Sequence, residues 1–402
     1  MASRRSLRGL DWFAFFVADI QTGWGPFVAT YLTSVGWAQL DIGLVLTIGT
    51  ITGLALQIPA GALVDCIRAK RVLAAIAVVS ISASALLLAE WPAFSPVIVA
   101  KILHALASCL LGPTLVAISL GLVGYGSFSR RLGRNARFLS FGNAIAAGIA
   151  GGLAYYYSNQ AIFLFTTALG VPTLLALAFI SPSEINPDLA RGTISKVPGN
   201  RLGAVFGLLR NRLLLAFAVA IAFFQLANTA MLPILGGALA IRDPQTAALV
   251  LSISILLPQF VVVVIAPWVG AKAEDWGRRP LLVVCFVALA IRATIFAATG
   301  NVYVLIMAQL LDGISAACLG VLVPLVIADV TQGSGRFNFS QGLVGTAVGI
   351  GASVSTTFAG YLTDLSGTPI AFIALACVSI AGLLFVLAFM PETSGDARSG
   401  RT

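Results

Sequence analysis

Of the 402 residues, 59% are hydrophobic and only 10% are charged. Soluble globular proteins carry about 25% charged residues, so this chain cannot form a water-facing surface of ordinary composition. We therefore exclude a soluble enzyme, a nucleic-acid-binding domain and a disordered chain, although 24 basic against 15 acidic residues give a net charge of +9.

Long apolar segments rich in Leu, Ala, Val, Ile and Gly follow one another along the whole chain. About 20 consecutive apolar residues suffice for one helix to span a bilayer. The segments lack the alternation of membrane barrel strands, and backbone in hydrocarbon must satisfy its own hydrogen bonds, so helices are predicted. The twelve predicted transmembrane helices are 10–33, 41–64, 72–90, 96–124, 138–157, 161–181, 213–240, 246–269, 280–299, 302–328, 339–363 and 369–390.

Basic residues gather before the first segment, after the last, and in every second loop between them. Alternating helices place all these regions on one side of the membrane, and the positive-inside rule makes that side the cytoplasm. We therefore predict a multi-pass protein of the cytoplasmic (inner) membrane with both termini in the cytoplasm. The basic residues concerned are Arg4, Arg5, Arg8, Arg68, Lys70, Arg71, Arg130, Arg131, Arg134, Arg137, Arg191, Lys196, Arg201, Arg210, Arg212, Lys272, Arg278, Arg279, Arg336, Arg398 and Arg401.

Residues 182–212 interrupt the apolar pattern with proline, glycine and charged residues, which is typical of a linker. The prediction is an N-terminal six-helix bundle at 1–181, this cytoplasmic linker, a C-terminal six-helix bundle at 213–390 and a cytoplasmic tail at 391–402. The five cysteines show neither disulfide nor metal spacing, so we expect no metal and no other cofactor.

The two halves of the chain resemble each other. Residues 100–112 align without gaps to 308–320, and residues 61–71 align to 270–280. A parallel repeat of six helices implies a pseudo-twofold axis along the membrane normal, with a central site that opens to either side as the bundles rock.

The two short loops of this repeat resemble the loop Gly-x-x-x-Asp-Arg-x-Gly-Arg-Lys/Arg of the major facilitator superfamily. The matching residues of the first copy are Gly61, Asp65, Lys70 and Arg71, while Cys66 and Arg68 depart from the pattern. Those of the second copy are Gly270, Gly277, Arg278 and Arg279, with Glu274 in the acidic place and Asp275 where Arg is expected. The resemblance implies an all-α membrane protein of twelve transmembrane helices in two pseudo-symmetric six-helix bundles, which acts as a secondary transporter.

Elementary chemistry gives these loops a role of their own. Gly61 and Gly270 permit close helix packing. Asp65 stands at a helix end, where it can pair with guanidinium groups or with a helix N-terminus of the other bundle. Such a contact, made in one conformation and broken in another, would be a conformational latch. The alternative is that the basic loops only fix the topology.

Five ionisable residues of the predicted transmembrane helices qualify by their position near the bilayer centre: Asp19, Lys101, His104, Arg292 and Asp312. A charge at the bilayer centre costs about 2.5–3.5 kcal/mol or more, so each calls for a functional or structural explanation. Asp19 lies in the middle of the first helix and is the strongest candidate for a proton carrier. Its alternative is a permanent ion pair with Lys101 or Arg292, and Arg292 is the candidate for a structural ion pair.

The repeat places His104, the only histidine, opposite Asp312. An imidazole with an ordinary pKa of about 6.5 is suited to proton exchange, whereas simple packing is the alternative for a lone histidine. Lys101 takes the place of an arginine that the family resemblance associates with proton coupling in antiporters. Alternatively, its ammonium group reaches back to the membrane surface.

Polar residues complete the predicted cavity. Gln21 follows Asp19 in the first helix, and Gln225 and Asn228 occupy the corresponding part of the seventh. Asn143 begins a stretch that resembles the antiporter signature Gly-x-x-x-Gly-Pro-x-x-Gly-Gly but lacks its proline, which weakens the case for antiport.

These residues predict a secondary active transporter that moves a small organic solute by alternating access, coupled to protons and working as an exporter. The alternatives are a proton-coupled importer of a small metabolite or siderophore-like solute, and a non-transporting membrane receptor or scaffold. An enzyme is not expected, since neither a histidine cluster nor a Ser/His pair is present. The expected partners are the solute, protons and the lipid bilayer, with no nucleic acid, and the expected state is a monomer.

Overall fold

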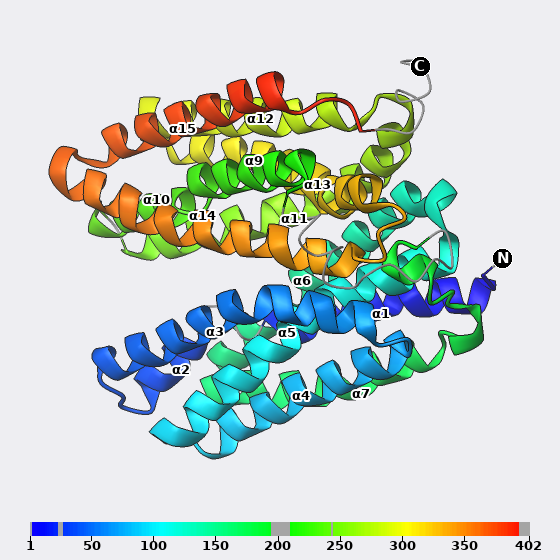
Figure 1. Ribbon diagram of the computed structural model, residues 1–402. Coiled ribbons are helices and arrows are strands. Elements are labelled where there is room, and N and C mark those ends of the chain that lie inside the picture. The colour runs from blue at the N-terminus through cyan, green and yellow to red at the C-terminus, as the bar shows by residue number, and fades with distance from the viewer. Residues whose placement is uncertain (1, 23–26, 194–209, 243, 394–402) are drawn as a thin grey trace. The chain divides into compact units, whose positions relative to one another are not determined.

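The computed structural model describes residues 2–22, 27–193, 210–242 and 244–393, and every regular element of these residues is a helix (Figure 1). Most of the predicted linker (194–209) and most of the predicted tail (394–402) lie outside the described residues. The chain divides into two compact units. The first unit comprises Met1–Val197 with Gln332–Gly342, and the second comprises Pro198–Thr331 with Leu343–Thr402.

The helices of the first unit follow the apolar segments of the sequence. They are α1 (Arg4–Thr22), α2 (Phe27–Ser34), α3 (Gln39–Cys66), α4 (Lys70–Glu90), α5 (Phe94–Val123), α6 (Phe128–Tyr156) and α7 (Asn159–Ala178), with short 3-10 turns η1 (Tyr125–Ser127), η2 (Pro182–Glu184) and η3 (Leu189–Arg191). The first predicted span is thus made of α1 and α2, on either side of residues 23–26, which are not described.

The second unit repeats this organisation. Its helices are α9 (Arg212–Asn228), α10 (Met231–Arg242), α11 (Pro244–Asp275), α12 (Arg278–Ala298), α13 (Val302–Thr331), α14 (Phe337–Ser366) and α15 (Thr368–Phe389). The seventh predicted span is divided between α9 and α10, just before Pro233. Ser355 compensates for this break, because its hydroxyl accepts a hydrogen bond of 3.0 Å from the Ala230 N–H.

Among the described residues, eleven helices are long and apolar enough to cross a membrane. Three helix pairs that pack in the first unit have counterparts in the second: α3 with α5, α4 with α5 and α4 with α7 correspond to α11 with α13, α12 with α13 and α12 with α15. The predictions of an all-helical membrane protein and of a fold built from two similar bundles are confirmed.

Three predicted helix boundaries were wrong: α1 begins at Arg4 and not at residue 10, α11 ends at Asp275 and not at residue 269, and α6 begins well before residue 138. The sequence interpretation placed Arg130–Arg137 in a loop before a helix at residue 138, but α6 already begins at Phe128. A helix can carry these arginines since it presents them at one end of the unit, where Asp11 of α1 binds two of them. We call this end of the first unit, where α1, α4 and α6 begin and α3 and α7 end, the basic end.

Candidate functional site

The Asp65 carboxylate is buried at the basic end of α3. It accepts hydrogen bonds from the backbone N–H of Asn338 (3.1 Å), the Asn338 side-chain Nδ2 (2.8 Å) and the backbone N–H of Phe339 (2.8 Å). These N–H groups belong to the first turn of α14, where they have no partner within the helix. A carboxylate at this place is also favoured by the helix dipole. Of the two partners that the sequence left open, Asp65 therefore has the helix N-terminus.

Two glycines let α3 and the start of α14 approach each other closely. A Cβ atom on Gly61, one turn before Asp65, would collide with the Asn338 carbonyl group. A Cβ atom on Gly342 would collide in the same way with the carbonyl group of Gln57. Any larger residue at either place would force the helices apart and lengthen the hydrogen bonds of Asp65.

The residues 332–342, which we call the α14 entry segment, are also held by the chain that follows α7. The Gly333 N–H donates to the Gly192 carbonyl at 2.6 Å, and Asn338 Nδ2 donates to the Ala190 carbonyl at 3.0 Å. Phe337 is fully buried, with its ring centroid 6.1 Å from that of Phe128. The segment therefore packs within the first unit, although the sequence order places it after α13.

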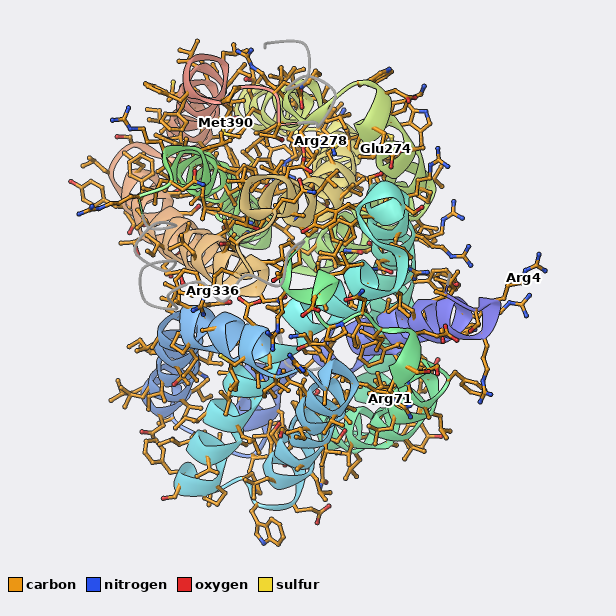
Figure 2. All side chains as sticks on the ribbon, turned by 45° about the vertical axis from the view of Figure 1, so that its right-hand side comes forward. Arg4, Arg71, Glu274, Arg278, Arg336 and Met390 are labelled. Atoms are coloured by element: carbon orange, nitrogen blue, oxygen red, sulfur yellow. The ribbon has the colours of Figure 1, made fainter. Side chains whose placement is uncertain are left out.

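The basic residues of the first loop copy have different places. Lys70 is buried and donates a hydrogen bond to the Val64 carbonyl group, so its ammonium group lies at the C-terminal end of α3, where the helix dipole favours a cation. Arg71, labelled in Figure 2, lines a cavity of about 430 Å³ between α4 and α7.

The arginines of the second loop copy form an ion pair and hydrogen bonds with two acids. Arg278 Nε forms an ion pair of 2.9 Å with Asp329 at the end of α13. Glu392, after α15, accepts the backbone N–H groups of Arg278 (2.8 Å) and Arg279 (3.1 Å), which open α12. Gly277 has φ +86° in front of that helix start, a conformation that favours glycine.

The remaining second-copy candidates lie around this start. Gly270 is buried in α11, and Glu274 is half-buried one turn later. The sequence interpretation missed Asp329 and Glu392. Both are acids at the end of a predicted helix, on the side of the membrane predicted for Arg278 and Arg279. This position is the only sequence signal that could have indicated them.

Asp11 was missed as well. Buried about two turns inside α1, it accepts hydrogen bonds from Arg131 Nη2 at 2.7 Å and from Arg134 at 2.8 Å and 2.5 Å. Arg131 Nε donates a hydrogen bond to Asn135 Oδ1 at 2.7 Å, and Asn135 Nδ2 donates one to the Ser119 hydroxyl at 2.7 Å. This network ties α1, α5 and α6 together at the basic end.

Three of the residues predicted to line a cavity, Gln21, Lys101 and His104, do line one cavity of the first unit. It has a volume of about 630 Å³ and lies between α3 and α5, with Gln21 at the end of α1 on its wall. Lys101 and His104 are one turn apart on the α5 face, and His104 Nε2 lies 3.2 Å from the Ser108 hydroxyl. The space exists because α3 presents small residues here: a Cβ atom on Gly53 would meet nothing within 4 Å.

Asp19 belongs to α1 and its side chain lies at the contact of α1 with α6. It is buried, and its Oδ1 has no hydrogen-bond partner among the described residues. The helices touch at Gly142, where a Cβ atom would collide with the Phe15 carbonyl and lie 2.9 Å from Asp19 Oδ1. Asn143, the next residue of α6, is half-buried.

In the second unit, Arg292 of α12 forms an ion pair with Asp312 of α13. Arg292 Nη2 also donates to Asn228 Oδ1 at 2.6 Å and contacts the Met231 sulfur at 3.1 Å. Gln225 lies one turn earlier in α9, where its Oε1 accepts from the Thr229 hydroxyl at 3.3 Å. Asp312 and His104 are equivalent in the repeat but have unlike surroundings. Asp312 contacts a buried guanidinium group, whereas His104 lines an open cavity.

The sequence matches the Major Facilitator Superfamily over residues 12–265 and 213–401. An uncharacterized MFS-type transporter of Mycobacterium tuberculosis is 39% identical over 393 residues, which cover 97% of this chain and 94% of that protein. The chain belongs to the Major Facilitator Superfamily; it is a multi-pass membrane transporter, and not an enzyme.

More distant similarities agree with this assignment. The class B tetracycline resistance protein of Escherichia coli is 30% identical over 131 residues, which cover 33% of this chain and 32% of that protein. The solved structure of the human organic anion transporter MFSD10 (TETRAN) has a TM-score of 0.70 and 14% identity, covering 95% of this chain and 99% of that one. That of the MFS transporter FucP in the outward conformation has a TM-score of 0.70 and 16% identity, covering 96% and 99%.

Proposed function

We propose that this transporter exports a small organic molecule from the cytoplasm in exchange for protons, with both chain termini on the cytoplasmic side. The observation that carries the proposal is Asp19, a buried carboxylate within a transmembrane bundle, one of whose oxygens has no described hydrogen-bond partner. A carboxyl group that is alternately buried and hydrated binds a proton in the first state and releases it in the second. That cycle is what an antiporter needs.

The cavity of the first unit favours substrates with negative charge or several polar groups. Of the described residues that line it, Lys101 carries a formal charge at neutral pH. The polar lining residues are Gln21, Thr50, Gln57, His104 and Ser108. Ammonium, amide and hydroxyl groups bind carboxylates and phenolates well, whereas a lipophilic cation would meet Lys101 with like charge.

The contact between Asp65 and the start of α14 is the proposed latch of the transport cycle. Because it joins the α14 entry segment to α3, it can hold one conformation and break in the other. The similarity to a tetracycline resistance protein over a third of the chain supports the direction of export.

Two experiments test this function. In the first, the purified chain is screened by thermal shift at two pH values with tetracycline, salicylate and tetraphenylphosphonium, since a ligand at 100 times its Kd stabilises by about 2.7 kcal/mol. We expect stabilisation by tetracycline or salicylate and its loss in Lys101→Gln. Stabilisation by the cation alone would contradict the assigned charge.

In the second experiment, the compound that binds is offered to everted membrane vesicles with an acidic interior. We expect uptake that a protonophore abolishes and that Asp19→Asn lacks. Glu90→Gln is the matched control because it removes an exposed acid at the end of α4. Uptake only in vesicles of native orientation would indicate an importer, and binding without gradient-driven movement would indicate a receptor.

A further inference from the structure

A second feature of the first unit lies outside the proposed transport path: a groove of about 570 Å³ between the start of α1 and the end of α7. Arginines occupy one part of it and apolar side chains the rest. The lining residues are Arg4, Arg5, Arg8, Gly9, Trp12 and Phe16 of α1 with Pro172, Leu175, Ala176 and Phe179 of α7.

The shape of the groove follows from one glycine. A Cβ atom on Gly9 would lie 2.9 Å from Phe179 Cβ and 3.1 Å from the Ala176 carbonyl oxygen, so the two helices touch here. Larger side chains on both sides of this floor form the walls. Trp12 is 49% exposed and Leu175 is 58% exposed, as are many apolar side chains on the surface of this membrane-spanning bundle, which lipid covers.

The positive charge at the mouth of the groove is not neutralised within the described residues, where Arg4, Arg5 and Arg8 form no ion pair with a carboxylate. Figure 2 shows Arg4 at the end of α1, pointing away from the helices. Arg5 lies over the Phe179 ring, 5.3 Å from its centroid. Glu184, which follows α7, accepts a hydrogen bond of 2.8 Å from the backbone N–H of Ser3, just before α1.

We propose that this groove binds an anionic phospholipid. Arg4 and Arg8 would hold the phosphate and its anionic headgroup, and an acyl chain would lie along Trp12, Phe16 and Leu175. The groove is at the basic end of a membrane-spanning bundle, the level at which arginine and tryptophan side chains meet lipid headgroups. A free phosphate would use the arginines but would leave the apolar walls exposed, so the lipid accounts for both parts of the site.

Native mass spectrometry of the full chain in detergent tests this site, with phosphatidylglycerol and phosphatidylcholine of identical acyl chains as the probes. Each basic residue near the headgroup contributes about fivefold in affinity, so Arg4→Gln with Arg8→Gln should weaken phosphatidylglycerol binding about 25-fold. Arg130→Gln, an exposed arginine of α6 that does not line the groove, should leave it unchanged. Melting temperatures confirm that each variant is folded.

A second variant separates the groove from general attraction to a positive surface. Leu175→Gln removes an apolar contact on the exposed α7 wall without changing the charge of the surface, so it should weaken binding of phosphatidylglycerol in the groove. Equal affinity of the unaltered chain for both lipids would overturn the proposal. So would unchanged phosphatidylglycerol binding in the double arginine variant or in Leu175→Gln, and so would complete displacement of the lipid by millimolar inorganic phosphate.

Discussion

Replacing Asp65 by asparagine should release the α14 entry segment from α3. The carboxylate accepts three hydrogen bonds from Asn338 and Phe339. In Asp65→Asn one amide oxygen remains for two of the donors, while the amide NH2 faces the third. Hydrogen bonds to charged groups contribute about 1.5–3 kcal/mol and neutral ones about 0.5–1.5 kcal/mol. One bond is thus lost and two are each weakened by about 1–1.5 kcal/mol, a total of about 3.5–6 kcal/mol, or about 400- to 25,000-fold in the docking equilibrium.

Hydrogen–deuterium exchange of the peptide that covers 332–342 measures this equilibrium directly. We expect faster exchange by that factor at the Asn338 and Phe339 amides, limited by the contacts that remain at Ala190 and Gly192. Asp41→Asn is the control, because it removes an acid at the opposite end of the same helix, α3. The reasoning is refuted if exchange of the segment in Asp65→Asn equals that of the unaltered chain.

The remaining predictions concern buried charges and close packing. Asp11→Asn leaves the buried Arg131 without its carboxylate and should destabilise the protein by about 3–5 kcal/mol; an unchanged melting temperature would contradict this role. Gly142→Ala should cost about 1–3 kcal/mol by separating α1 from α6, and Gly148→Ala, where a Cβ atom meets nothing within 4 Å, is the comparison. Arg292→Met alone should destabilise more than Arg292→Met with Asp312→Leu, because the double variant leaves no unpaired charge; a double-mutant cycle of thermal melts would show additivity if the pair were unimportant.

The fold could be predicted because hydropathy and loop charge act locally along the chain. Gly61 and Asp65 were recognisable for the same reason, since they stand in a short pattern that occurs twice. The boundary of α6 was wrong because hydropathy marks where a helix enters hydrocarbon, and α6 continues beyond that point through four arginines.

The partners of the predicted residues could not be read from the sequence. Asn338 lies 273 residues from Asp65, and nothing in either pattern specifies which helix N-terminus receives the carboxylate. The repeat suggested that His104 and Asp312 have equivalent roles, but symmetry of position does not give symmetry of neighbours. Asp312 forms an ion pair with Arg292, whereas His104 lines a cavity.

Infrared spectroscopy of the purified chain tests the central claim, that Asp19 binds and releases a proton, without any knowledge of the substrate. A protonated carboxyl group has a carbonyl band that is distinct from those of amides and carboxylates. Titration between about pH 5 and pH 8, the range of physiological proton exchange, should change this band in the unaltered chain and in Glu90→Gln. In Asp19→Asn the amplitude of this change should be smaller by the contribution of one carboxyl group. A band that titrates fully in Asp19→Asn would contradict the account and assign the proton to another group.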